Sequence, residues 1–191
     1  MTKSSTQTEE RLLDLAESLI RKNGYNGFSF RELAAGIGVK SSSVHYYFPT
    51  KADLGAKVAR RYTDRFLIAL EEAAPSKGPA ASADDILTQL RLLFRKALTE
   101  DGKMCLCGVL AAEASGLPEE VTLETRSFFS RLAQWLENAL ARTRWGMGAS
   151  AEERHKAALK ALALFEGALL VARVHESTEL FDLIEADPLE A

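Results

Sequence analysis

Phe30-Arg-Glu-Leu-Ala-Ala-Gly-Ile-Gly-Val39, continued by Val44-His-Tyr-Tyr-Phe-Pro-Thr-Lys-Ala-Asp-Leu54, decides the fold of this 191-residue chain. The capping pair Ser29 and Glu32 predicts a short helix that ends in a turn bracketed by Gly36 and Gly38. A second short helix is predicted from about residue 41 to residue 47, because Pro49 disfavours helix at the residue before it. Two short helices joined by a glycine-containing turn have the proportions of a DNA-reading helix-turn-helix.

Outside this stretch, apolar residues recur at helical spacing, and the fold class predicted is all-α. Helices are expected over residues 6–23, 50–74, 82–100, 105–115, 119–143 and 150–177, and the first is expected to begin with a capping box at Thr6. Loops are expected at 75–82 and 146–150. We expect a helix-turn-helix DNA-binding domain at 1–55 and a second helical domain at 56–191.

Charge is unevenly distributed along the chain. The whole chain has a net charge of −3, but residues 1–62 hold ten basic and six acidic residues, a net +4, and the remainder carries −7. A basic segment joined to an acidic one indicates that only the first meets a polyanion. The start has no apolar signal segment and no apolar run approaches the length of a membrane span, which predicts a cytoplasmic protein.

The sequence offers no set of residues for catalysis or for a structural metal. Two cysteines and three scattered histidines do not form a zinc ligand set or a disulfide framework. No nucleophile elbow or phosphate loop is present. We therefore expect no enzyme, no metal and no cofactor. The remaining rival is a helical adaptor that binds protein without DNA affinity.

Residues 8–58 resemble the DNA-binding signature of the TetR family of repressors, above all in the ending Tyr-Phe-Pro-x-Lys-x-x-Leu. The resemblance implies a homodimer that reads a pseudo-palindromic operator, a small-molecule effector bound in the C-terminal domain, and no enzymatic activity. It implies base-facing positions for Ser41, Ser42, Ser43 and Tyr46, phosphate contacts for Tyr47 and Lys51, and positions near the groove edge for Ser29 and Arg31. His45 stands where the family usually has a phosphate-contacting tyrosine, and an imidazole can also donate to a phosphate.

By the same resemblance, an effector cavity is expected among the helices from about residue 62 to residue 140. The candidate lining residues are Phe66, Leu70, Leu90, Phe94, Leu98, Met104, Cys105, Cys107, Leu110, Phe128 and Trp135. The effector would be small and largely apolar or electrophilic, and Glu113 or Arg95 could anchor a polar end. The alternative is that these residues are plain core.

Cys105 and Cys107 have two open interpretations. A thiol near a helix start has a lowered pKa and could sense electrophiles or oxidants, or both thiols are inert packing. Residues two apart on a helix point to opposite sides, so a mutual disulfide is disfavoured.

Two apolar stripes predict a dimer interface built from the last two long helices, with intramolecular packing of the same faces as the alternative. The stripes are Phe128, Phe129, Leu132, Trp135, Leu136 and Leu140 on one helix, and Leu159, Leu162, Leu164, Phe165, Leu169 and Leu170 on the other.

Overall fold

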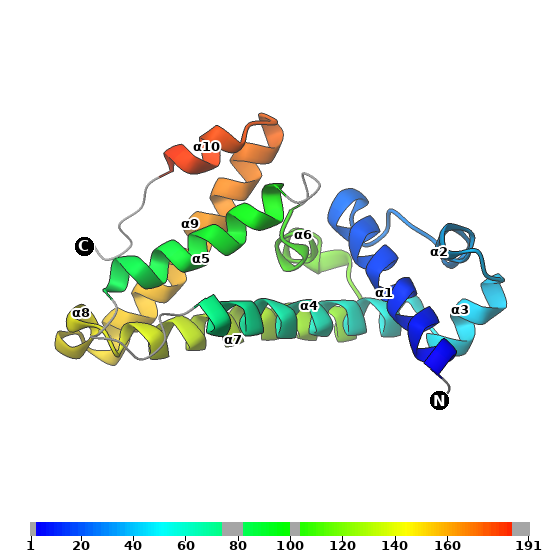
Figure 1. Cartoon of the computed structure of the whole chain (residues 1–191), viewed down its shortest axis with the longest axis horizontal. Coiled ribbons are helices and arrows are strands. Elements are labelled where there is room, and N and C mark those ends of the chain that lie inside the picture. Colours follow the sequence, from blue (N-terminus) through cyan, green and yellow to red (C-terminus); the bar gives the residue numbers. More distant parts are fainter. Residues whose placement is uncertain (1–2, 74–81, 100–103, 185–191) are drawn as a thin grey trace. The chain divides into compact units, whose positions relative to one another are not determined.

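The computed structural model, described for residues 3–73, 82–99 and 104–184, contains helices and no strand over those ranges (Figure 1), which confirms the all-α prediction. The helices are α1 (Lys3–Asn23), α2 (Phe30–Ile37), α3 (Ser41–Tyr47), α4 (Lys51–Ala73), α5 (Ala83–Thr99), α6 (Leu106–Ala112), α7 (Glu119–Leu140), α8 (Arg144–Gly148), α9 (Ala151–Val174) and α10 (Thr178–Leu183), with a 3-10 turn at Ala114–Gly116. Within the described ranges, none of these helices is long and apolar enough to cross a membrane.

Most predicted helix starts are confirmed by their caps. Ser29 and Glu32 form a capping box at α2, and Ser150 forms one with Glu153 at α9. The pairs at residues 50 and 53 before α4, and at 82 and 85 before α5, make the same reciprocal bonds. Hydrogen bonds from the cap serine hold the pKa of Glu32 and of Glu153 below the usual range. Capping boxes of this kind therefore predict helix starts well from the sequence alone.

Other helix ends differ from the prediction. α1 begins at Lys3, so Thr6 lies inside the helix and is no cap. α7 ends at Leu140, three residues before the predicted end at 143. The Thr143 hydroxyl accepts the Gly146 N–H at 3.0 Å and caps α8, which runs into the predicted loop at 146–150. The predicted loop at 75–82 lies outside the described residues except for its last residue.

The final helix, predicted over residues 150–177, ends three residues early in the structure, and a short helix that was not predicted follows it. α9 ends at Val174, and the chain turns at Glu176, whose φ is 51°. The Ser177 hydroxyl then accepts the Leu180 N–H and caps α10. This turn is not evident from the sequence, because Glu is not a residue type typical of a left-handed conformation.

The chain divides into two compact units, and each is described by itself. Unit 1 comprises Met1–Thr63 and Leu106–Phe128; unit 2 comprises Asp64–Cys105 and Phe129–Ala191. This division differs from a single boundary at residue 55, because α6 returns to pack against α1 within unit 1. The core of unit 1 includes Leu12, Ile20, Leu33, Val44, Phe48 and Leu54.

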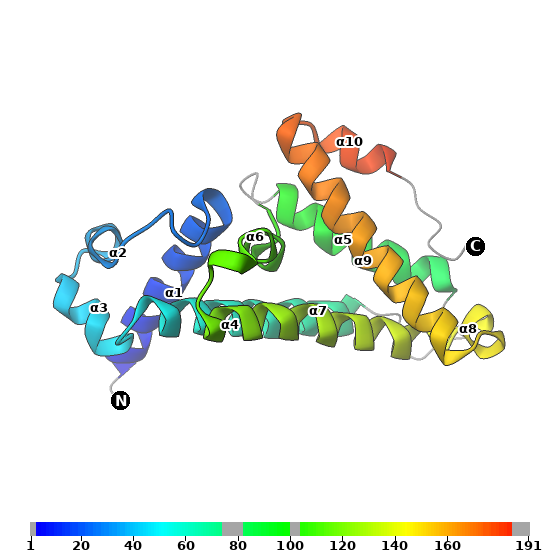
Figure 2. The same ribbon diagram turned by 180° about the vertical axis from the view of Figure 1, so that it is seen from behind.

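In unit 2, α5 packs on α9, and α10 packs on both (Figure 2). Aromatic rings form the centre of this packing. The rings of Phe94 and Phe165 stack with their centroids 5.9 Å apart, Phe66 meets Phe94 edge to face at 5.4 Å, and Phe181 lies 6.5 Å from Phe165. Burial of these rings stabilises unit 2.

The predicted dimer stripes are largely used inside the single chain. Phe128, Leu132, Leu136, Leu140, Leu162, Phe165 and Leu169 are all buried. For these seven residues the intramolecular alternative is correct. Leu159 and Leu170 of α9 are exposed, and so are Val171 and Val174 near its end.

Candidate functional site

The turn between α2 and α3 is fixed by backbone bonds that need a glycine. Gly38 has a φ of +75°, a left-handed conformation that costs little only without a Cβ, and its N–H donates to the last carbonyls of α2. Arg11 of α1 donates from Nη2 to the Ile37 carbonyl oxygen at 3.0 Å. α1 thereby holds the end of α2, and the two short helices keep a defined geometry.

α3 presents a polar face outward. Tyr46 is 78% exposed, and Ser41, Ser42 and His45 are also exposed, whereas Ser43 is half-buried. The inner side of this segment is held by Val44 and Phe48, which are buried. The structure therefore places the predicted base-facing hydroxyls on an accessible helix surface.

The remaining aromatic side chains of α3 are supported by neighbouring rings. Tyr47 is half-buried and meets Tyr46 edge to face at 5.1 Å between centroids. The His45 ring lies 4.9 Å from the ring of Phe30 on α2. These contacts limit the rotamers of His45 and Tyr46 without covering them.

Two further predicted contact residues lie at the start of α2. Arg31 is exposed. Ser29 is exposed as well, but its hydroxyl donates to Glu32 Oε2 at 2.8 Å and accepts the Glu32 N–H. Ser29 therefore already acts as the cap of α2.

Lys51 has partners within the protein, although the resemblance implied a phosphate contact. Its ammonium donates to the Phe28 carbonyl oxygen at 2.6 Å and lies over the rings of Phe28 and Tyr25, at 4.3 Å and 5.0 Å. Burial lowers the pKa of Lys51, an effect that the carboxylates of Glu32 and Glu113 oppose. The geometry makes Lys51 a link between the start of α4 and the loop before α2.

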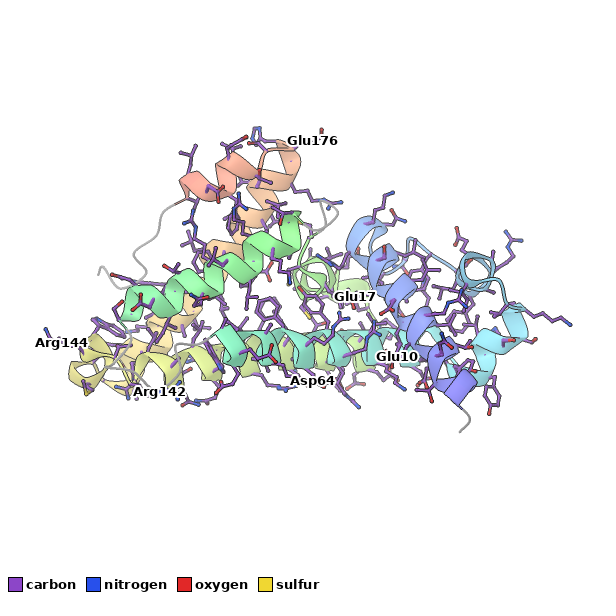
Figure 3. The ribbon with its side chains drawn as sticks, in the orientation of Figure 1. Glu10, Glu17, Asp64, Arg142, Arg144 and Glu176 are labelled. Atoms are coloured by element: carbon purple, nitrogen blue, oxygen red, sulfur yellow. The ribbon has the colours of Figure 1, made fainter. Side chains whose placement is uncertain are left out.

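Ion pairs neutralise much of the basic charge of the N-terminal segment. Lys57 pairs with Glu9, and Arg61 contacts Glu10 at 2.7 Å and Glu17 at 3.4 Å. Glu10 and Glu17 both project from α1 (Figure 3). The net +4 of this segment is thus not all available to a polyanion.

An exposed lysine beside the reading helix was missed by the sequence analysis. Lys40 is exposed and is the N-cap residue of α3, directly before the three serines. Its position next to a predicted recognition helix was the available signal. Lys40 and Arg31 place positive charge close to the polar face of α3.

The two residues suggested as polar anchors for an effector have other bonds. Glu113, the residue after α6, accepts the Tyr25 N–H on Oε2 at 3.0 Å. Arg95 of α5 donates twice to Asp182 of α10, at 2.7 Å and 2.8 Å, and these bonds raise its pKa further. Both side chains therefore connect helices: Glu113 joins α6 to the end of α1, and Arg95 joins α5 to α10.

The candidate effector-lining residues are nearly all buried, as both core packing and a ligand cavity require. Unit 2 holds Phe66, Leu70, Leu90, Phe94, Leu98, Met104, Cys105 and Trp135, and unit 1 holds Cys107, Leu110 and Phe128. Trp135 differs from the rest, because it is half-buried at an open groove of about 740 Å³ and donates its indole N–H to Glu71 at 2.9 Å.

Cys105 and Cys107 are unoxidised thiols with no exposed surface. Burial shields both thiols from reagents in solution, which favours the packing interpretation. Among the described residues, no group of histidines, cysteines and acids could hold a metal ion.

Comparisons with known proteins agree with this geometry. The family model for bacterial regulatory proteins of the tetR family matches residues 12–58, and the model for the C-terminal domain of LmrA/YxaF-like transcriptional regulators matches residues 79–187. An uncharacterized HTH-type transcriptional regulator in the dhlA 5' region of Xanthobacter autotrophicus is 33% identical over 99 residues, which are 50% of this chain and 47% of that protein. The chain thus spans about half the length of that curated relative.

Solved structures match nearly the whole chain. A TetR transcriptional regulator from Legionella pneumophila is 33% identical, with a TM-score of 0.80, over 92% of this chain and 91% of that one. A TetR-family regulator from Agrobacterium tumefaciens is 28% identical, with a TM-score of 0.82, over 94% of both chains. The C-terminal model alone matches more than half of the sequence, and the exposed reading helix fits the N-terminal model. The chain belongs to the TetR family of DNA-binding transcriptional regulators.

Proposed function

We propose that this protein is a ligand-responsive repressor that binds a pseudo-palindromic operator as a homodimer and is released by a small, largely apolar effector. The observation that carries the proposal is the outward polar face of α3, held on a helix-turn-helix of fixed geometry. The TetR family is generally non-enzymatic, and we propose no catalytic role for this member.

In the proposed complex, Ser41, Ser42, Ser43 and Tyr46 read base edges in the major groove. Phosphate contacts come from the exposed side chains of Arg31, Lys40 and His45 and from the half-buried Tyr47. Lys51 acts indirectly, because its bond to the Phe28 carbonyl sets where α4 begins relative to α2.

The homodimer is supported by the exposed side of α9. Leu159, Leu170, Val171 and Val174 lie on one stripe of this helix and are 46% to 81% exposed. Gly167 lies in the same stripe, and a Cβ built there would meet nothing within 4 Å, so the backbone is open to close approach by another helix. Exposed apolar stripes of this kind mark interaction surfaces.

Selection from a random DNA library tests the operator. The full chain is expected to enrich an inverted repeat. The centres of its two half-sites should lie about one helical turn of DNA apart, or a whole multiple of that distance. Tyr46→Ala should change the enriched bases, and Lys40→Ala should weaken binding to all sequences about equally. Glu152→Gln, on the exposed start of α9, is the matched control.

A salt titration separates this function from the adaptor alternative. Operator affinity should fall steeply as salt rises, with a log–log slope of about −0.9 for each phosphate contact. A chain that enriches no sequence and binds DNA without salt dependence would favour the protein-binding adaptor.

A further inference from the structure

The carboxyl group of Glu166 on α9 has an unusual environment. The residue as a whole is half-buried at the edge of the helix, yet both carboxyl oxygens are fully buried. Charged side chains at such an edge normally extend their head groups into water. Here the stem lies near the surface and the acid points inward.

Within the part of the chain that the structure describes, no donor satisfies this carboxyl group. Neither Oε1 nor Oε2 accepts a hydrogen bond. The Cys105 thiol is the titratable group near enough to lower the pKa of Glu166, but it lies outside the geometry of a full hydrogen bond. Burial outweighs this effect and raises the pKa to about 7.

The two arginines of α5 do not donate a hydrogen bond to the Glu166 carboxyl group. Arg91 donates to the Asp182 carbonyl oxygen at 2.7 Å, and Arg95 is bonded twice to the carboxylate of the same residue. A buried carboxyl group without a partner costs free energy unless something binds it. A ligand that supplies a donor would remove this cost.

The buried positions of α9 next to Glu166 in the helix are apolar and partly aromatic. Its neighbour Phe165 belongs to the ring cluster with Phe94 and Phe181, and Cys105 and Leu169 are fully buried. A ligand placed here would contact hydrocarbon and aromatic surface and meet one acid. An anion would be repelled by that acid, and a wholly apolar molecule would leave it unsatisfied.

We propose that Glu166 anchors the effector, and that the effector is an amphipathic amine whose protonated nitrogen donates to this carboxylate while its apolar body packs against the hydrophobic interior of unit 2. The inference rests on the proposed function, because it names the chemical class of the ligand in that same regulator. The pair would form between an ionised Glu166 and a charged nitrogen, so binding at neutral pH should release a proton.

Three ligands of the same shape test the charge requirement: 2-(1-naphthyl)ethylamine, 2-(1-naphthyl)ethanol and 1-naphthylacetate. Their own fluorescence reports binding to the full chain by anisotropy at pH 7.5. The amine is expected to bind at least tenfold more tightly than the alcohol, and the acetate least. Equal binding of all three, or binding of none, would overturn the inference.

Two variants test whether Glu166 is the anchor. Glu166→Gln should lower amine affinity at least tenfold and leave alcohol affinity unchanged, whereas Glu152→Gln, an exposed acid on the same helix, should change neither. Unchanged amine affinity in Glu166→Gln would assign the buried acid to the structure alone.

A second readout needs no variant. Between pH 6 and pH 8 the ionised fraction of Glu166 rises, so the affinity of the wild-type chain for the amine should rise about tenfold, with proton release seen by calorimetry in buffers of different ionisation enthalpy. A flat profile without proton release would overturn the inference. The DNA selection tests the proposed function separately. If no operator is enriched, the repressor proposal is overturned. If the amine binds no more tightly than the alcohol, only the role of Glu166 as the effector anchor is overturned.

Discussion

At the scale of single residues, two half-buried ionisable side chains, Lys51 and Glu166, have opposite surroundings. Lys51 has a carbonyl oxygen and two aromatic rings around its ammonium, whereas neither oxygen of Glu166 accepts a hydrogen bond within the described chain. Neither arrangement could be predicted from the residue pattern. Which way a long side chain turns depends on groups brought close by tertiary packing, such as Phe28, which is 23 residues from Lys51.

Replacing Lys51 by Met should destabilise the protein but leave the salt dependence of DNA binding unchanged. The change removes a charge-assisted hydrogen bond and cation–π contacts, and we expect a loss of about 1 to 2 kcal/mol in the free energy of unfolding. Urea unfolding measures this. Lys40→Ala, at an exposed position, should leave stability unchanged but reduce the salt slope of DNA binding by about 1. A reduced slope for Lys51→Met would instead place its ammonium on a phosphate.

Replacing Glu166 by Gln should stabilise the protein at alkaline pH and not at acid pH. The folded pKa is raised from 4.5 to about 7, so the protonated acid is the favoured form, and stability is lost as pH rises through this range. Above pH 7 the variant should exceed the wild type by about 3 kcal/mol in unfolding free energy, and below pH 4.5 the two should agree. Denaturant unfolding from pH 4 to pH 8 checks the sign; a difference independent of pH would contradict it.

At the scale of elements, the sequence predicted what is local. A capping box spans only four residues, so the helix starts capped by Ser29, Thr50, Ser82 and Ser150 were predicted correctly. The break before α10 depends on Glu176 in a conformation that its residue type does not favour, and α8 is a single turn in a glycine-containing segment. Such short elements are stabilised by tertiary packing more than by their own propensity.

The junction between α1 and α6 offers a sharp test with a matched control. Gly24 and Gly38 both have left-handed φ angles, +81° and +75°, so an alanine at either strains the backbone by about 1 kcal/mol or more. A Cβ at Gly24 would also overlap Oε1 of Glu113, a carboxylate whose other oxygen, Oε2, accepts the Tyr25 N–H. A Cβ at Gly38 would meet nothing within 4 Å.

Gly24→Ala should therefore cost about 1 kcal/mol more than Gly38→Ala in unfolding free energy. In a Glu113→Ala background, where the overlapping carboxylate is absent, this extra cost should disappear. Urea unfolding of the four variants forms the cycle. An extra cost that persists without Glu113 would mean that α6 does not contact the end of α1 in this way.

At the scale of the whole molecule, the fold class and the reading helix could be predicted from the sequence. Which apolar faces belong to the core and which remain exposed could not. Leu162 and Leu170 are equally apolar in sequence, yet one is buried in unit 2 and the other is 54% exposed. Helical periodicity identifies apolar stripes; it does not say whether another part of the same chain covers them. The separation of core from interface needed the packed structure.

Leu170→Glu should convert the proposed dimer into single chains. A charge placed in an apolar contact between two copies must be desolvated, and each lost leucine forfeits about 1.5 to 3 kcal/mol of burial. Sedimentation equilibrium should show the mass halved, and operator affinity should fall accordingly. Leu92→Glu, at a similarly exposed leucine of α5, is the control and should remain dimeric. Dissociation by both, or by neither, would move the interface away from α9.

The exposure of Tyr46 makes the recognition helix chemically addressable. Of the four tyrosines, Tyr25 and Tyr62 are buried and Tyr47 is partly covered, so a reagent that iodinates phenols should modify Tyr46 first. A bound duplex would shield that ring. The iodine content of the tryptic peptide that contains Tyr46, followed by mass spectrometry, would then measure operator occupancy.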